Sequence, residues 1–262
     1  MFDPLFHLPL PVAGALIIGC LCVYSMVGLA LVRRFVMPRL RVTGEDSDFT
    51  GAMVQAVMVF YGLAVALVAV SVWETHSGVS AVVSLEASRL GGLYRDVSGY
   101  PEPIRTELRE ELHGYTDYVI HDAWPAQRKG IHPTGGVVWM NRFQLTLCAF
   151  EPATEGQKIL HGEALGAYNR LIEARRLRLD AMLVRLPGAL WFVIGFGGCI
   201  SLASTFLFKI QDFRLHAIQV LLLSIFVGLV ITLIFAFDRP FQGDLAVGSE
   251  PYRLVRDQLM IK

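Results

Sequence analysis

The long apolar stretches of this chain contain no charged side chain. Four such stretches are present, and none of them holds an Asp, Glu, Lys or Arg. Carriers that couple transport to protons or sodium ions usually need an ionisable group near the membrane midplane. The absence of such a group argues against a coupled carrier. It is compatible with a pore lined by apolar and aromatic side chains, which gates by dewetting.

Cysteines and basic residues are too sparse or too scattered to define a site. No two of the four cysteines have zinc-finger spacing, and no disulfide framework is indicated. The 23 Lys and Arg balance 23 Asp and Glu, so electrostatics give no reason to expect a nucleic-acid partner. A Ser/His/Asp order, a phosphate-binding glycine loop and paired catalytic carboxylates are also missing. We therefore expect neither an enzyme nor a bound cofactor.

One periodic group of polar residues has part of the pattern of a metal site. His113, Asp117 and His121 recur every four residues, which places them along one helix face. A fourth ligand and the supporting hydrogen-bond partners of a metal site are not visible. We interpret the three residues as an ordinary polar helix face and expect no bound metal.

The four apolar stretches are each long enough to cross a membrane. About 20 apolar residues in a helix span the roughly 30 Å hydrocarbon core of a bilayer. We predict an all-α integral membrane protein with four transmembrane helices and a central helical extramembrane domain. The predicted spans are Leu8–Val32, Gly51–Trp73, Leu186–Phe208 and Ala217–Phe237.

These spans divide the chain into a transmembrane hairpin (1–73), a helical extramembrane domain (74–185), a second transmembrane hairpin (186–237) and a C-terminal tail (238–262). Two hairpins place both termini and the domain on one face of the membrane. Six Lys or Arg flank the spans on each side, so the positive-inside rule does not choose that face. Met1–His7 lacks Lys and Arg, so we expect the first span to stay as an anchor rather than be cleaved as a signal peptide.

The central block has helical periodicity and nearly no strand signal. Helices are predicted over 75–98, from Pro101 to a stop at Trp124-Pro125, and over 137–150. A further helix begins at Glu155 and can continue toward the third span, with Pro187 at the boundary.

Two charged residues fall on the apolar stripes of these helices. Glu86 lies on the stripe of the helix over 75–98. Arg175 takes an apolar position in the helix that begins at Glu155, on a stripe with Tyr168, Ile172 and Leu179. An unpaired charge in such a position would cost several kcal/mol. We predict a structural ion pair between Glu86 and Arg175, within or between subunits. The alternative is that one or both side chains point to solvent.

Span two and the span ends hold the candidate pore residues. The pore-lining candidates are Gln55, Val59, Phe60, Tyr61 and Ser71, and packing against the other spans is the alternative. The residues of a charge cluster at the membrane edge are Glu74, Arg185, Asp238 and Arg239. Such charges either mark the end of the hydrocarbon layer or form a ring at a pore mouth that sets ion preference.

Several short motifs resemble those of a bacterial membrane family. They are Phe60-Tyr61-Gly62-Leu63, Glu86-Ala87, Leu93-Tyr94, Tyr118, Trp124-Pro125, Arg175-Arg176 and Asp238-Arg239-Pro240-Phe241-Gln242-Gly243. Together they are similar to the bestrophin-like family of unknown function, over a region from about Gly51 to the end. Where members often have Glu-Trp-Pro, this chain has Asp122-Ala123-Trp124-Pro125. The family-motif residues are Trp124, Pro125, Asp238, Arg239, Pro240, Phe241 and Gly243.

The resemblance implies an architecture and a function. Bestrophins are pentameric anion channels with a cytosolic helical domain, so it implies a multi-pass protein of the bacterial inner membrane with its domain in the cytoplasm. We expect a homo-oligomeric ion channel whose partners are the lipid bilayer, further copies of itself and small inorganic ions. The arginine-rich helix before the third span would attract anions. The alternative function is a non-conducting membrane scaffold or sensor whose helical domain binds another protein.

Overall fold

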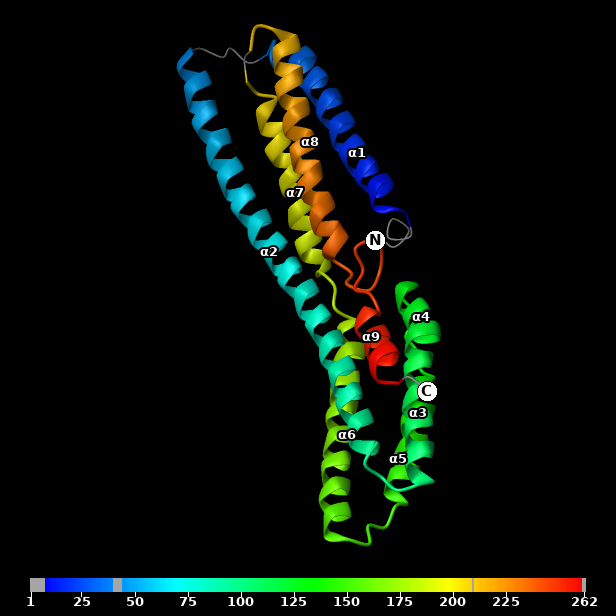
Figure 1. Ribbon diagram of the computed structural model, residues 1–262. Coiled ribbons are helices and arrows are strands. Elements are labelled where there is room, and N and C mark those ends of the chain that lie inside the picture. Colours follow the sequence, from blue (N-terminus) through cyan, green and yellow to red (C-terminus); the bar gives the residue numbers. More distant parts are fainter. Residues whose placement is uncertain (1–7, 40–43, 209, 261–262) are drawn as a thin grey trace. The chain divides into compact units, whose positions relative to one another are not determined.

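The computed structural model describes residues 8–39, 44–208 and 210–260, with the backbone only for 44–48. Most of these residues are helical and none of them forms a strand, which confirms the predicted all-α fold (Figure 1). The helices are α1 (Leu10–Leu31), α2 (Gly44–Val97), α3 (Ile104–Tyr118), α4 (Trp124–Arg128), α5 (Gly136–Cys148), α6 (Glu155–Ala181), α7 (Gly188–Thr205), α8 (Phe213–Phe237) and α9 (Glu250–Leu259). Two π-helical turns are η2 (Val32–Val36) and η3 (Val119–Ala123).

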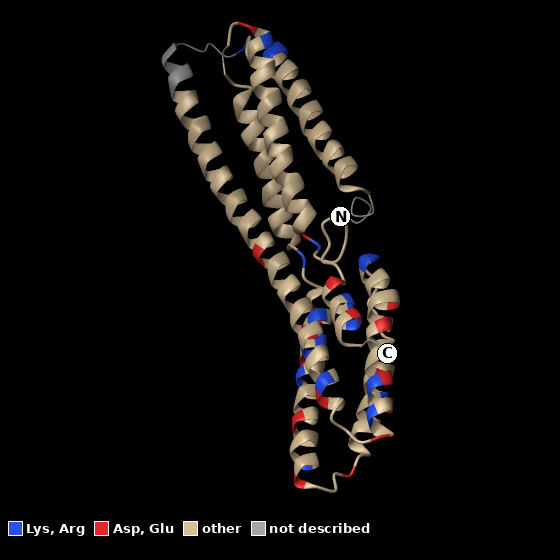
Figure 2. Ribbon diagram, in the orientation of Figure 1, with Lys and Arg blue, Asp and Glu red and all other residues tan. Residues whose placement is uncertain are grey.

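The chain divides into two compact units. The membrane unit, as we name it, comprises Met1–Glu74 and Arg185–Asp238, and the extramembrane unit comprises Thr75–Val184 and Arg239–Lys262. Four helices are long and apolar enough to cross a membrane, as predicted. In Figure 2 the membrane unit is tan along most of its helices, with charged residues near their ends, whereas Lys, Arg, Asp and Glu are frequent on the elements of the extramembrane unit.

The membrane unit is held by close packing of small and apolar side chains. Leu29, Ile194 and Ile234 are buried in its core. A Cβ added to Gly228 of α8 would lie 3.1 Å from the Ile18 Cα of α1, so this glycine permits close approach of the two backbones. Ser224 of α8 donates a hydrogen bond of 2.7 Å to Ser25 of α1, which satisfies two buried hydroxyls. Packing and one polar contact therefore join α1 to α8.

The extramembrane unit has a continuous apolar core. Its fully buried apolar residues include Leu90, Leu93 and Val97 from α2, Leu108 and Leu112 from α3, Phe143 and Leu147 from α5, and Leu171 from α6. Helix α6 begins with a capping box, in which Thr154 and Gln157 satisfy each other's backbone N–H groups. The C-terminal tail, predicted only as a tail, contains the helix α9 and contributes the fully buried Tyr252.

Two predicted helix boundaries are wrong. Trp124-Pro125 does not end the helical segment that includes α3, because the chain passes through η3 and continues as α4 to Arg128. Pro125 lies in the first turn of α4, where a missing N–H costs little, and a π turn precedes it. Helix α6 does not continue into the third span. It ends at Ala181, and α7 begins after Pro187, which lacks an N–H and disfavours a helical residue before it.

The packed face of α6 also differs from the prediction by one residue. The predicted stripe ran through Tyr168, Ile172, Arg175 and Leu179 at spacings of three and four. The observed face follows the same spacing one position earlier. The buried residues on this face are Ala164, Ala167, Leu171, Ala174, Arg178 and Ala181, and Tyr168 and Arg175 of the predicted stripe are buried beside them. Alanines let the helix pack closely, and this face carries Arg178 into the core.

Candidate functional site

A buried ion pair lies at the centre of the extramembrane unit. Glu86 of α2 is fully buried, and Arg178 of α6 is 2% exposed. The Arg178 Nε donates to Glu86 Oε2 at 2.6 Å, and its Nη2 donates to Oε1 at 3.3 Å. Two parallel N–H···O contacts make this a bidentate pair, the arrangement in which Arg binds carboxylates most strongly.

Polar side chains from two further helices complete the hydrogen bonding of this pair. The Tyr115 hydroxyl of α3 donates to Glu86 Oε1 at 2.7 Å. The Gln127 side chain of α4 accepts a 3.0 Å hydrogen bond from Arg178 Nη1. Both residues are fully buried. Helices α2, α3, α4 and α6 therefore share one buried polar network.

Aromatic rings enclose the guanidinium of the pair. Arg178 Cζ lies 5.5 Å from the ring centre of Trp124 and 5.9 Å from that of Tyr252 in α9. These are cation–π distances, and such contacts are worth more when desolvated. The Trp124 Nε1 donates to the Val247 carbonyl at 3.1 Å, and its ring meets Phe241 edge-on with centres 5.9 Å apart. The motif over 238–243 thus contributes to the network through Phe241.

Burial and the central carboxylate set the electrostatics of this network. Burial, and then the Glu86 carboxylate, raise the pKa of the Tyr115 hydroxyl well above its usual range. The same two causes raise the pKa of Tyr252. Burial disfavours the charged form of Arg178, but Tyr252 and Glu86 favour it, and the pKa of the guanidinium rises well above its usual range. The network therefore holds one carboxylate, one guanidinium and two neutral phenols.

The prediction that Glu86 pairs with Arg175 is wrong within this chain. Arg178 pairs with Glu86, whereas Arg175 lies almost one turn earlier on α6. Arg175 is 8% exposed, and its guanidinium lies beside Gly136, where an added Cβ would be 3.1 Å from Nη2. The displacement of the packed face by one residue explains the difference, because it directs Arg178 toward α2.

The charged residues at the span ends differ in their exposure and in their hydrogen-bond partners. Glu74 and Arg185 are exposed. Asp238 is buried, accepts the Leu186 backbone N–H at 2.6 Å and faces the Trp191 Nε1 at 3.4 Å, so it joins the end of α8 to the chain before α7. Arg239 donates to the Gln242 side chain at 3.0 Å.

The remaining family-motif residues build the turn that presents Phe241. Pro240 is buried, and its carbonyl accepts the Val247 N–H at 2.8 Å. Gly243 has a φ of +82°, a left-handed conformation that favours glycine. Pro125 is exposed in the first turn of α4. These residues shape the backbone around the network rather than forming a reactive site.

The pore-lining candidates on α2 do not all face the same way. Gln55, Val59, Phe60 and Ser71 are exposed on the membrane unit, with Val59 at 62% and Phe60 at 74%. Tyr61 instead turns inward, and its hydroxyl donates to the Ile194 carbonyl of α7 at 3.0 Å. Gln55, Val59 and Phe60 therefore remain available to a pore, a lipid or a neighbouring copy.

The periodic polar residues of α3 and η3 have protein partners. His113 Nδ1 lies 3.1 Å from Asp117, and Arg256 of α9 lies 3.4 Å from Asp117 and 3.2 Å from His121 Nε2. Across the described part of the chain, no group of three or more His, Cys, Asp or Glu could hold a metal. Asp117 and His121 therefore contact Arg256, and His113 contacts Asp117.

Fold and network together define the class of this protein. It is a multi-pass helical membrane protein whose extramembrane helices and C-terminal segment close around a buried Glu–Arg pair. The model of the Bestrophin-like domain matches residues 19–252, which is most of the chain. The chain belongs to the bestrophin-like family.

A solved structure shares the fold. It is the crystal structure of a protein described only as a membrane protein, and it aligns with a TM-score of 0.62 at 11% sequence identity. The alignment covers 93% of this chain and 97% of the other. At this identity the likeness shows the fold alone. No curated protein matches the chain. Family membership indicates a channel-type membrane protein.

Proposed function

We propose that this protein is a homo-oligomeric ion channel whose pore is lined by the membrane part of α2. The observation that carries the proposal is one uncovered, charge-free face of α2. Its exposed residues, at spacings of three and four, are Gln55, Val59, Leu63, Leu67 and Val70. A helix face that repeats around an axis in several copies would line an apolar pore. A pentamer is the assembly that the family resemblance favours.

The exposed charge at the end of this face bears on the permeant ion. Glu74 follows Val70 by four residues and is exposed, so it continues the same face. A ring of carboxylates at a pore mouth favours cations. The expectation of anions relied on the arginines of α6. Of these, Arg178 is paired with Glu86 and Arg175 is buried, whereas Arg170 and Arg176 are exposed. We therefore propose small inorganic ions as the permeant class, with a preference for cations at the Glu74 mouth.

Ion flux into liposomes tests the proposal. The purified protein would be reconstituted, and flux measured against empty vesicles under several salts. In a background with all four cysteines changed to Ser, Val59→Cys would be treated with a charged thiol reagent. Val193→Cys is the matched control, because Val193 of α7 is 50% exposed but lies outside the α2 face. Block at Val59 alone supports the pore, and flux that neither variant alters contradicts it.

The second candidate function is a non-conducting scaffold or sensor. Exposed apolar side chains on the extramembrane unit support it, since no lipid covers them there. They include Val138 at 71% and Leu145 at 73% on α5, and Ile159 at 70% on α6. Such a surface suits a protein partner, either another copy or a different chain. Absence of flux in liposomes, with a stable protein, would favour this candidate.

We also propose that the protein resides in the bacterial inner membrane with its extramembrane unit in the cytoplasm. Cys148, exposed at the end of α5, can report this orientation. A membrane-impermeant thiol reagent added to intact spheroplasts should not modify Cys148, and should modify it after lysis. Modification before lysis would place the extramembrane unit outside.

A further inference from the structure

The N-terminus of α5 carries backbone donors that have no protein partner. Helix α5 has 13 residues, and its N-cap residue, Gly135, has no side chain to cap it. Val137 and Val138 donate their N–H groups to the carbonyls of Thr134 and Gly135. The N–H groups of Gly135 and Gly136 donate to no residue in the described part of the chain. Free donors of this kind, together with the helix dipole, make the end of a helix attractive to anions.

A buried guanidinium lies against this helix end. Arg175 of α6 is 8% exposed, and its Nη2 and Nε would lie 3.1 and 3.4 Å from a Cβ added to Gly136. The Nε is buried without a hydrogen-bond partner, and Arg175 forms no ion pair with any described residue. A buried charge is costly unless it is paired. Two positive groups therefore meet here, and no carboxylate of the described chain lies within ion-pair distance of the guanidinium.

The glycine pair at the start of α5 keeps side chains out of this place. A Cβ on Gly136 would lie 3.2 Å from the Tyr118 ring as well as 3.1 Å from Arg175. A Cβ on Gly135 would lie 2.9 Å from the Tyr118 hydroxyl, which is a further hydrogen-bond donor at the same helix end. Backbone N–H groups, one guanidinium and one phenol hydroxyl are thus gathered around the two glycines.

The chemistry of these donors selects an oxyanion. The planar fork of a guanidinium matches two oxygens of one ligand, and N–H groups at a helix N-terminus bind the remaining oxygens. Because Arg175 has only 8% of its surface exposed, the opening suits a free ion and not a phosphate carried by a large molecule. We propose that Gly135, Gly136, Arg175 and Tyr118 bind a small oxyanion such as inorganic phosphate. The proposal does not depend on ion conduction.

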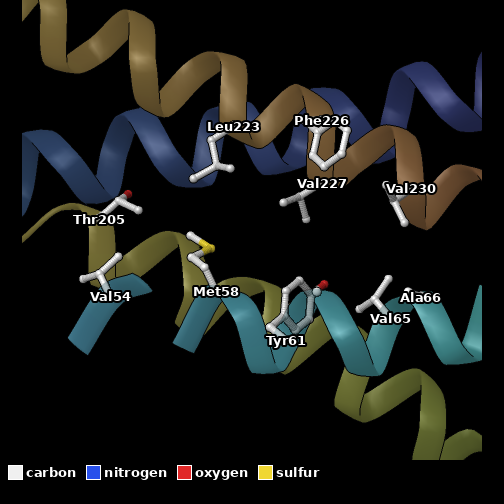
Figure 3. A pocket seen from close by; sticks show the side chains of 11 residues that line it. Val54, Met58, Tyr61, Val65, Ala66, Thr205, Leu223, Phe226, Val227 and Val230 are labelled. Carbon is white, nitrogen blue, oxygen red and sulfur yellow. The ribbon is translucent and has the colours of Figure 1, made fainter. Parts of the chain in front are cut away.

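The apolar groove of the membrane unit offers no comparable site. Residues of α2 and α8 form most of its walls, and only Tyr61 and Thr205 among its lining residues have polar side chains (Figure 3). Their hydroxyls already donate to backbone carbonyls of α7. The groove has no charged side chain that could hold an anion. Binding of phosphate is therefore expected at α5 and not in this groove.

Phosphate titration of the full-length protein in detergent tests the site. A ligand that binds only the folded state raises the melting temperature in proportion to its occupancy. Sodium phosphate, exchanged for sodium chloride at constant ionic strength, should raise the melting temperature and give a dissociation constant. It should also slow deuterium exchange of the backbone over 131–140, which includes the two proposed N–H donors. Glycerophosphate, which carries the same group on a larger molecule, should bind more weakly.

Variants of Arg175 and of its neighbours assign the effect. Arg175→Gln should weaken phosphate binding by about tenfold or more, because it removes charge-assisted hydrogen bonds. It should not lower the melting temperature without phosphate, since it removes an uncompensated buried charge. Arg176→Gln makes the same change of charge at an exposed position of α6 and should bind phosphate like the unaltered protein.

A second pair of variants serves if Arg175→Gln does not fold. Gly136→Ala should weaken binding, because its methyl group would lie 3.1 Å from Nη2 of Arg175. Gly156→Ala in the first turn of α6, with no atom within 4 Å of an added Cβ, is the control. The proposal is overturned if phosphate changes neither the melting temperature nor the exchange of the unaltered protein. Equal weakening by Arg175→Gln and Arg176→Gln would also overturn it, as would tighter binding of glycerophosphate than of phosphate.

Discussion

Glu86 and Arg178 form a bidentate ion pair, with Nε and Oε2 2.6 Å apart, although they are 92 residues apart in the sequence. Both side chains are buried, and their remaining polar atoms contact Tyr115 and Gln127. A buried pair of this kind costs desolvation energy and often adds little net stability, but breaking it leaves a charge without compensation. The pair therefore fixes how α2 and α6 align.

The first prediction concerns this pair. Glu86→Leu should lower the free energy of unfolding by about 3–5 kcal/mol, because Arg178 would stay buried without its carboxylate. The double change Glu86→Leu with Arg178→Met should recover most of that loss. Denaturant unfolding of the purified protein in detergent, followed by tryptophan fluorescence, measures both. Arg176→Met, on an exposed position of α6, is the control and should stay within about 0.5 kcal/mol. Equal losses in the single and double variants would contradict the pairing.

The second prediction concerns alkaline pH. The pKa values of Tyr115 and Tyr252 are raised in the folded protein, whereas an unfolded tyrosine titrates near about 10. A raised folded pKa means that stabilisation is fully present below the unfolded value and is lost as pH rises toward the folded value. Stability should therefore fall above about pH 10. Phenolate absorbance and unfolding, followed together, should show that these two tyrosines ionise only on unfolding.

A variant of Tyr115 tests whether this residue causes the loss of stability at alkaline pH. Tyr115→Phe should flatten the fall in stability above about pH 10. It should also cost about 1–3 kcal/mol at neutral pH, because Glu86 loses a buried donor. Reversible ionisation of every tyrosine near the ordinary value in the folded protein would contradict the prediction.

The third prediction concerns packing in the membrane unit. Gly228→Ala should destabilise the contact between α8 and α1 by about 1–3 kcal/mol, because the added Cβ would lie 2.8 Å from a side-chain carbon of Ile18 and 3.1 Å from its Cα. Gly195→Ala has open space around its Cβ and should be neutral or slightly stabilising. Thermal unfolding in the same detergent compares the two. A loss of the same size at both positions would indicate a general effect of alanine and not close packing.

The fourth prediction concerns ion preference in the proposed channel. Glu74→Gln should move the reversal potential in a KCl gradient toward the chloride equilibrium potential, because a carboxylate at the mouth attracts cations. The shift should be larger at about 10 mM than at 1 M salt, where screening lengths are roughly 30 and 3 Å. Planar-bilayer recording measures it, with Glu110→Gln on an exposed position of α3 as the control. A reversal potential that Glu74→Gln leaves unchanged at low salt would remove Glu74 from the mouth.

The spans were predictable because length and lack of charge are strong signals that need no tertiary information. Glu86 was also predictable, since a carboxylate on an apolar stripe has few structural explanations. Its partner was missed because the stripe of α6 was read from large apolar side chains such as Ile172 and Leu179. The packed face is centred one residue earlier, and half of the buried residues of α6 are alanines, which carry little hydrophobic signal.

The C-terminal helix was missed for a different reason. α9 is short and rich in charged residues, and the apolar residues of its packed face are only Tyr252, Val255 and Leu259, too few to stand out in the sequence. Its helical state depends on packing against a core built from distant segments. The motif over 238–243 was visible as a family feature, but its contact with Trp124 through Phe241 joins residues over a hundred positions apart. The spacing of residues in the sequence cannot predict a contact between such distant positions.

The late position of Tyr252 has a consequence for biosynthesis. Glu86, Tyr115 and Trp124 leave the ribosome long before α9 exists, and α7 and α8 must be inserted in between. Until Tyr252 and Val247 are made, the ring system around Arg178 lacks one side and the indole N–H of Trp124 lacks its acceptor. The nascent protein therefore keeps an incomplete core until α9 has been synthesised and has packed against it.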